Sequence, residues 1–130
     1  MAQNITVAWL DDGTLSRLAG QRACDPSIWA QRFDPTSPSE FYRGYATLLV
    51  RIGDAFRAKA NLAALRQLID DFDSAIKALP ANEQRNGASF ALMNVASYAQ
   101  AGTAAQITAT LAAELPCIAQ CFVHNRDRGL

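Results

Sequence analysis

The stretch SPSEFYRGYATLLVRIGDAFRAK, residues 37–59, decides the fold class of this chain. Placed on a helical wheel at about 100° per residue, its side chains separate into an apolar side and a polar side. The apolar side holds Phe41, Tyr45, Leu48, Leu49, Ile52, Ala55 and Phe56, and the polar side holds Glu40, Arg43, Thr47, Arg51, Asp54 and Arg57. This separation predicts an amphipathic α-helix that buries one face.

The start of this helix carries three residue types that favour a helix N-terminus. Ser37 is a capping residue type, and Pro38 follows at the first helical position, where its missing N–H costs nothing. Glu40 stands three residues after Ser37, which is the spacing of a capping box. We therefore predict a helix that begins just after Ser37 and ends near Lys59.

Residues 61–100 predict two more helices. Asn61 is a capping residue type at the start of the first, which we expect to end at about Leu79, before Pro80. We expect residues 84–87, Gln-Arg-Asn-Gly, to form a loop or the frayed start of the next helix. That helix is predicted to run from about residue 88 to residue 100.

Residues 101–130 predict a fourth helix, a short fifth helix and a polar tail. Gly102 stands where a left-handed cap would end the preceding helix, and Thr103 is a suitable cap for the fourth. We expect Pro116 to end the fourth helix. The short last helix carries Ile118, Cys121 and Phe122, and residues 125–130 form the tail.

Residues 1–36 predict an irregular segment with short elements. Ile5, Val7 and Trp9 alternate with smaller residues, which is a weak strand signal. Such a lone strand would need another copy or a partner to pair with. A short helix is expected over residues 14–23, and Asp25-Pro26 opens a second helical turn or two that reaches Phe33.

Together these elements predict an all-α fold: a compact antiparallel bundle of about five helices with an irregular N-terminal third. With 130 residues, half of them apolar or aromatic, the chain is expected to form one domain, residues 1–130. Its parts are the irregular residues 1–36, the bundle of residues 37–124 and the tail. Zero net charge and the many alanines of the third and fourth helices permit a homodimer.

Composition also limits the setting of the protein. Twelve basic and twelve acidic residues give no basic excess for a nucleic-acid or membrane surface. The N-terminus lacks a signal-peptide pattern, and no stretch approaches the roughly 18 apolar residues of a membrane span. Three cysteines, an odd number, do not suggest a disulfide framework. We therefore expect a reducing, cytoplasmic setting without membrane contact.

The most metal-like arrangement is the set Cys117, Cys121 and His124, which lie at i, i+4 and i+7 on one helix face. Cys24 would complete a Cys₃His set of the kind that zinc favours. We favour the alternative that the cysteines are core residues and His124 stabilises a helix end, so we predict no metal and no cofactor. A Cys117–Cys121 disulfide is disfavoured, because helical β-carbons at that spacing lie about 5–6 Å apart.

Residues 70–73, Asp-Asp-Phe-Asp, form an acidic cluster that could hold Mg²⁺. We interpret it as a solvated helix face, with Asp70 paired to Arg66 and Asp73 paired to Lys77. Asp71 points elsewhere on the helix.

The candidate interaction surface combines an arginine stripe with aromatic residues of the N-terminal third: Arg43, Arg51, Arg57, Trp9 and Trp29. Arginine pairs with carboxylates and phosphates, and tryptophan is a common interface anchor. Asp54 partly neutralises the stripe, and no aromatic residue on the same face could stack bases.

Catalysis is not predicted, because the chain has one histidine and no glycine-rich phosphate loop. The sequence instead favours a non-catalytic protein-binding module: an adaptor, an inhibitor or immunity-type protein, or an accessory subunit of a larger complex. One alternative is a nucleic-acid-associated subunit that uses the arginine stripe. A second alternative is a metal-binding or redox domain built on the cysteines and His124.

Overall fold

A computed structural model describes residues 5, 7–25, 36–59 and 61–130 of the protein, and over these residues the structure is all-helical. Its helices are α1 (Asp12–Ala19), α3 (Ser39–Lys59), α4 (Leu62–Lys77), α5 (Glu83–Ala101) and α6 (Ala104–Asp127). The prediction of a compact all-α bundle of about five helices is therefore confirmed. The helical turn expected at Asp25-Pro26 and the side chain of Trp29 lie outside the described residues.

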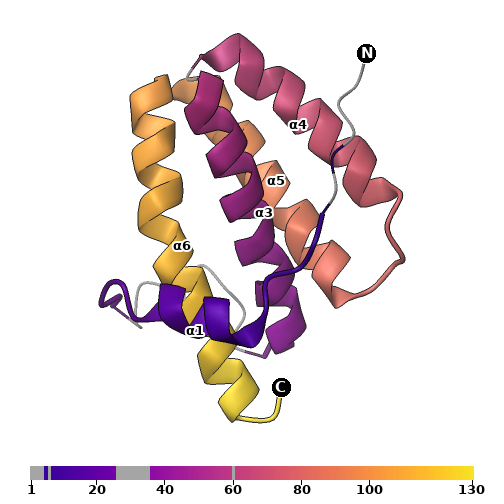
Figure 1. The fold of residues 1–130 in the computed structure, drawn as a ribbon, viewed down its shortest axis with the longest axis vertical. Coiled ribbons are helices and arrows are strands. Elements are labelled where there is room, and N and C mark those ends of the chain that lie inside the picture. The colour runs from indigo at the N-terminus through magenta and orange to yellow at the C-terminus, as the bar shows by residue number, and fades with distance from the viewer. Residues whose placement is uncertain (1–4, 6, 26–35, 60) are drawn as a thin grey trace.

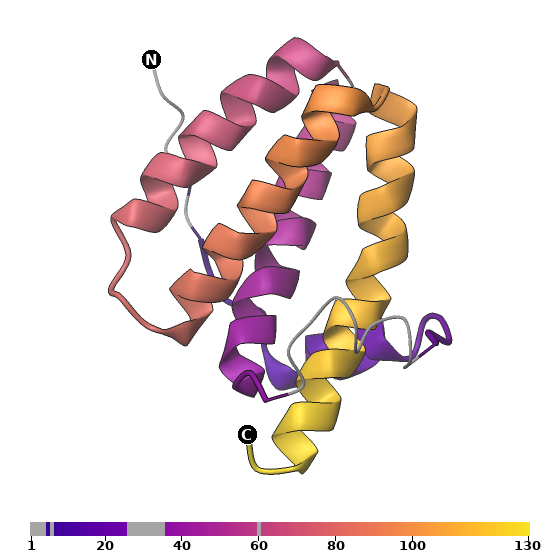
Figure 2. The same cartoon turned by 180° about the vertical axis from the view of Figure 1, so that it is seen from behind.

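Helix α3 lies at the centre of the bundle and contacts α4, α5 and α6 (Figure 1). Helices α4 and α5 cover one side of it, α6 covers the other, and α1 crosses α6 (Figure 2). The apolar side chains that the sequence placed on one face of α3 form the middle of the core, and Tyr45, Leu48 and Ile52 are completely buried. The amphipathic pattern thus identified the central helix.

Two glycines allow the backbones of α3 and α5 to touch. A β-carbon built on Gly87 would lie 1.8 Å from the carbonyl oxygen of Phe41, and one built on Gly44 would lie 1.9 Å from that of Gln84. The prediction of a loop or frayed start at residues 84–87 is therefore wrong, because Gly87 lies inside α5. The helix begins at Glu83, after Asn82 accepts a 2.9 Å hydrogen bond from the Arg85 amide.

Two predicted helix caps are confirmed. Asn61 begins α4, and its side chain accepts a 2.8 Å hydrogen bond from the Ala64 amide. Thr103 begins α6 with a complete capping box, in which Thr103 Oγ1 accepts from the Gln106 amide and the Gln106 side chain accepts from the Thr103 amide. Each cap satisfies N–H groups that the helix itself cannot.

The capping box predicted at Ser37 and Glu40 is wrong. Glu40 Oε2 instead accepts from Arg43 Nε at 2.5 Å. The Ser39 amide and the Ser39 hydroxyl both donate to the Leu130 carbonyl oxygen, at 3.2 Å and 2.7 Å. The far end of the chain therefore supplies the acceptor at the start of α3, a contact that local spacing could not reveal.

Helix α6 continues through Pro116, so the predicted break there is wrong. The proline removes one backbone N–H, but the flanking turns stay in place because α6 packs against α1, α3 and α5. The helix also extends to Asp127, so the tail predicted from residue 125 is shorter. Among the described residues, α6 alone is long and apolar enough to cross a membrane, a test that the core helix of a bundle also passes.

Gly102 does not adopt the predicted left-handed conformation. Its φ of −106° and ψ of 163° are extended, and its amide donates to the Tyr98 carbonyl oxygen at 2.9 Å. A β-carbon there would lie 3.2 Å from the Ile107 side chain. Gly102 therefore provides room for the side chain of Ile107 on α6, and it does not supply an unusual backbone angle.

Helix α1 is shorter than the predicted span of residues 14–23 and begins earlier. Asp11 caps it by accepting a 2.7 Å hydrogen bond from the Thr14 amide, which holds the pKa of Asp11 below its usual value. Leu15 is completely buried. Residues 5 and 7–10 form no strand and run over the outside of the bundle toward α4 (Figure 1).

Candidate functional site

Arg43, the first residue of the predicted stripe, is engaged within the fold. Its side chain is only 16% exposed and forms ion pairs of 2.5 Å with Asp12 and with Glu40. Its Nη1 also donates to the Leu10 carbonyl oxygen at 2.7 Å. Burial acts to lower the pKa of Arg43, but its hydrogen bonds to Glu40 and Asp12 outweigh this and raise the pKa above its ordinary value. Arg43 thus joins α1 to α3.

A second arginine helps to enclose the ring of Phe122. The guanidinium carbon of Arg43 lies 4.8 Å from the ring centroid, and that of Arg126 lies 5.5 Å from it. Arg126 is also 3.8 Å from Asp12 and 3.2 Å from Asp127. Cation–π contacts and shared carboxylates therefore hold α1, α3 and α6 together at this end of the bundle.

The other two arginines of the stripe have different surroundings: one contacts the N-terminal arm, which consists of the residues before α1, and the other is exposed to solvent. Arg51 Nη2 donates to the Ala8 carbonyl oxygen at 2.8 Å, so this side chain binds the arm. Arg57 is 67% exposed and pairs with Asp54 at 3.0 Å. Of the three predicted arginines, Arg57 is thus the one that projects into solvent. Trp9, an aromatic residue of the predicted interaction surface, packs in part against the core.

An apolar cleft of about 450 Å³ opens beside Arg57, between the end of α1, α3 and α6. Gly53 lies in its wall, and a β-carbon built there would meet nothing within 4 Å. Asp54 and Arg57 are its charged residues. Its other lining residues are Leu18, Gln21, Leu49, Val50, Phe56, Thr108, Leu111, Ala112 and Leu115.

The outer face of α5 is an apolar feature that the sequence reasoning missed. Phe90 is 46% exposed and Met93 is 66% exposed, although both are large apolar residues. The Phe90 ring lies 5.9 Å from that of Phe41 and 6.4 Å from that of Tyr45, so its inner side is anchored on aromatic rings of α3. The available signal was the weak separation of polar and apolar residues along α5.

The chain around these two residues also lacks charge. Residues 86–113 contain no Asp, Glu, Lys or Arg, and they include most of α5 and the start of α6 as far as residue 113. Loss of charged residues with retention of aromatic residues and methionine distinguishes the cores of protein interfaces from ordinary surface.

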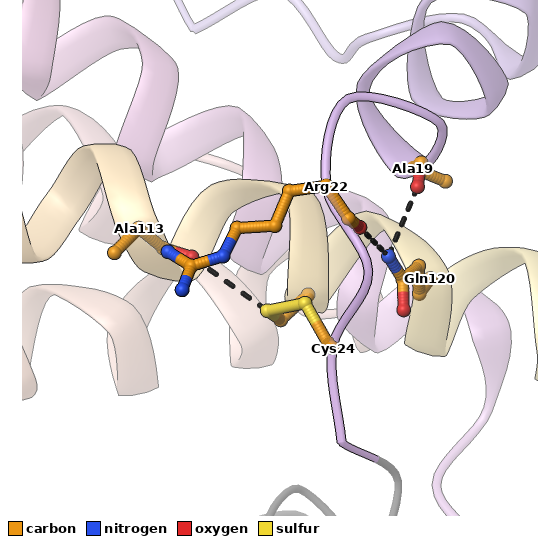
Figure 3. The surroundings of a disulfide bond; sticks show 6 residues. Ala19, Arg22, Cys24, Ala113 and Gln120 are labelled. Carbon is orange, nitrogen blue, oxygen red and sulfur yellow. Dashed lines mark hydrogen bonds between the residues drawn. A yellow bond between two sulfur atoms is a disulfide. The ribbon is translucent and has the colours of Figure 1, made fainter.

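Cys24 and Cys117 form a disulfide bond, with their α-carbons 5.7 Å apart. The sequence prediction of no disulfide framework is therefore wrong. Beside the bond, the Gln120 side-chain amide donates to the carbonyl oxygens of Ala19 and Arg22, which holds the segment after α1 on α6 (Figure 3). A structural disulfide is typical of oxidising compartments, so the cysteine count no longer supports the predicted cytoplasmic setting.

The third cysteine, Cys121, is free and partly buried, and burial raises the pKa of its thiol to about 11. His124 is exposed and lies 3.4 Å from Arg128. Cys24 and Cys117 are brought together, but as a disulfide, so these two sulfurs cannot act as thiolate ligands of a metal. Over the described residues no group of three or more His, Cys, Asp or Glu is placed to hold a metal ion.

The acidic cluster of α4 is partly solvated and partly buried. Asp73 pairs with Lys77 at 2.7 Å on the exposed face, as predicted. Asp71 is buried and accepts a 2.9 Å hydrogen bond from the Gln67 side chain. Asp71 and Asp73 therefore have local structural partners.

Comparison of the chain with protein-family models, with curated proteins and with solved structures finds no match.

Proposed function

We propose that this protein is a non-catalytic protein-binding module, and that its partner covers the outer face of α5 around Phe90 and Met93. The observation that supports this proposal is the exposure of Phe90 and Met93 on one face of α5, within a stretch of the chain that has no charged residue. Large exposed apolar groups on one such face are typical of interaction sites. The anchored Phe90 ring would lose little conformational freedom on binding.

The test is affinity capture from the lysate of the host, compared between variants. Met93→Glu places one negative charge on the proposed face, and Met93 is exposed enough for the fold to tolerate it. Ser74→Glu places the same charge on an exposed position of α4 and is the matched control. We expect the wild type and Ser74→Glu to retain a specific protein that Met93→Glu loses, with equal melting temperatures. Recovery of no partner, or equal recovery by Met93→Glu, would contradict the proposal.

The nucleic-acid alternative has less support, because Arg43 and Arg51 donate hydrogen bonds within the fold. It predicts binding that weakens steeply as salt concentration rises. Binding that does not respond to salt, measured by fluorescence anisotropy with a labelled oligonucleotide, would exclude it.

A further inference from the structure

The arm that precedes α1 is hydrogen-bonded along one backbone edge. The Leu10 amide donates to Thr47 Oγ1 at 3.1 Å, and the Leu10 carbonyl oxygen accepts from Arg43. The Ala8 carbonyl oxygen accepts from Arg51. Ala8 and Leu10 are two residues apart, and both turn backbone groups to α3. In an extended chain, the backbone groups of successive residues point to opposite sides, so this spacing is that of an extended chain.

The opposite edge carries the N–H and C=O groups of Val7 and Trp9. In an extended chain, these groups point away from those of Ala8 and Leu10. Over the described part of the chain, none of the four groups has a hydrogen-bond partner. Ala8 is exposed and its neighbours Val7 and Trp9 are partly buried, so this edge is partly open to solvent. An exposed edge of extended backbone is a template for another strand.

The sequence of the arm favours such pairing. Residues 5–10 read Ile-Thr-Val-Ala-Trp-Leu, which are mainly β-branched, aromatic or other apolar residues. In other proteins, exposed strand edges carry a proline or a charged residue, often lysine, that prevents association. Residues 5–10 contain none of these.

We propose that two copies of this protein pair through the outer backbone edge of residues 7–9 as a two-stranded antiparallel ribbon. With the two-fold axis at Ala8, Val7 of each copy lies opposite Trp9 of the other. Each such pair exchanges its two N–H···O=C bonds. Because the inner edge of the arm is covered by Arg43, Thr47 and Arg51, a third strand has no place to add and the assembly closes as a dimer.

A second copy is the occupant that these observations favour. An isologous contact requires a surface that complements itself, and an antiparallel pairing of identical edges meets that requirement. The net charge of zero means that no overall repulsion separates the copies. This contact uses residues that do not belong to the α5 face, so it is independent of the proposed function.

The experiment compares three full-length proteins by sedimentation velocity and native mass spectrometry over a range of concentrations. Val7→Pro removes an outer-edge N–H and leaves the bonds of Ala8 and Leu10 to α3. Val7→Thr keeps the N–H and the branched shape, and is the control. We expect the wild type and Val7→Thr to dimerise, and Val7→Pro to remain monomeric with unchanged helix content and melting temperature.

Hydrogen exchange gives a second, residue-level measurement. In the wild type, exchange of the Val7 and Trp9 amides should slow as dimer forms, because both amides become donors. A wild type that stays monomeric at every concentration would overturn the proposal. So would a Val7→Pro protein that dimerises as the wild type does. A dimer that is lost in Met93→Glu and kept in Val7→Pro would place the contact on α5 and overturn it as well.

Discussion

The Gly87→Ala substitution should lower the free energy of unfolding by about 2 kcal/mol or more, since it places a methyl group between two helix backbones. The new β-carbon would lie 1.8 Å from the carbonyl oxygen of Phe41, 2.7 Å from its carbonyl carbon and 3.0 Å from the amide nitrogen of Tyr45. Ordinary contact of a β-carbon begins near 3.4 Å, so α3 and α5 would have to move apart by roughly 1.6 Å.

The magnitude follows from two opposing effects. All three neighbours are backbone atoms, so no change of side-chain rotamer makes room, and overpacking of this kind costs about 1–3 kcal/mol, occasionally more. The upper end applies here, because separating the helices also loosens Tyr45 and Ala88, which are completely buried. Alanine stabilises a helix interior by about 0.5–1 kcal/mol relative to glycine, which offsets only part of that cost.

Equilibrium urea denaturation, followed by circular dichroism, measures the effect. Gly53→Ala is the matched control, because Gly53 lies in the interior of α3 and a β-carbon built on it would meet no atom within 4 Å. Gly53→Ala should raise the free energy of unfolding by about 0.5–1 kcal/mol. A Gly87→Ala protein as stable as the wild type would refute the reasoning, as would equal destabilisation by both substitutions.

Three further predictions concern the other ties between helices. Arg43→Met should lower the free energy of unfolding by about 2 kcal/mol because it removes the hydrogen bond to the Leu10 carbonyl oxygen and the ion pairs with Asp12 and Glu40, and Arg43→Lys should recover only part of the loss in denaturant titrations. Reduction of the Cys24–Cys117 bond should cost about 2–4 kcal/mol. Alkylation and mass spectrometry of denatured protein should then find three reactive thiols in place of one, and three before reduction would exclude the bond. Because burial raises the pKa of Cys121 from 9.0 to about 11, the native state keeps a proton that the unfolded chain loses. Stability should therefore fall as pH rises from 9 to 11, and less steeply in Cys121→Ala; parallel curves for the two proteins would count against a buried thiol.

The sequence predicted the parts of the fold that depend on short-range pattern. The apolar face of α3 and the caps Asn61 and Thr103 are set by neighbours within four residues, and the structure has all of them. Leu15, within the short helix expected over residues 14–23, is buried.

The errors occurred where a distant contact outweighs the local preference. Gly87 reads as a helix breaker, but the approach of α3 makes the absence of a side chain useful inside α5. Pro116 reads as a helix end, but packing on both sides keeps α6 continuous. Cys24 and Cys117 are 93 residues apart, and only the packing of the segment after α1 on α6 brings them together.

For the candidate site too, the sequence predicted what depends on local pattern and missed what depends on distant contacts. The arginine stripe of α3 does lie on one helix face, but a sequence pattern cannot say that Arg43 and Arg51 bind the chain's own arm. The face with Phe90 and Met93 was missed because an apolar residue on a helix is normally assigned to the core. Absence of charge over residues 86–113 was the visible signal that this helix differs from a solvated one.

The packing of α1 against α6 determines when a newly made chain can finish folding. At about 5–20 residues per second, the ribosome needs roughly 5 to 20 seconds to synthesise the 93-residue interval from Cys24 to Cys117. During that time Cys24 is an unpaired thiol, and Cys121 follows Cys117 out of the ribosome by only four residues. Selection of the correct sulfur therefore depends on α6 docking beside α1, so pairing of Cys24 waits for a helix that is made 93 residues later.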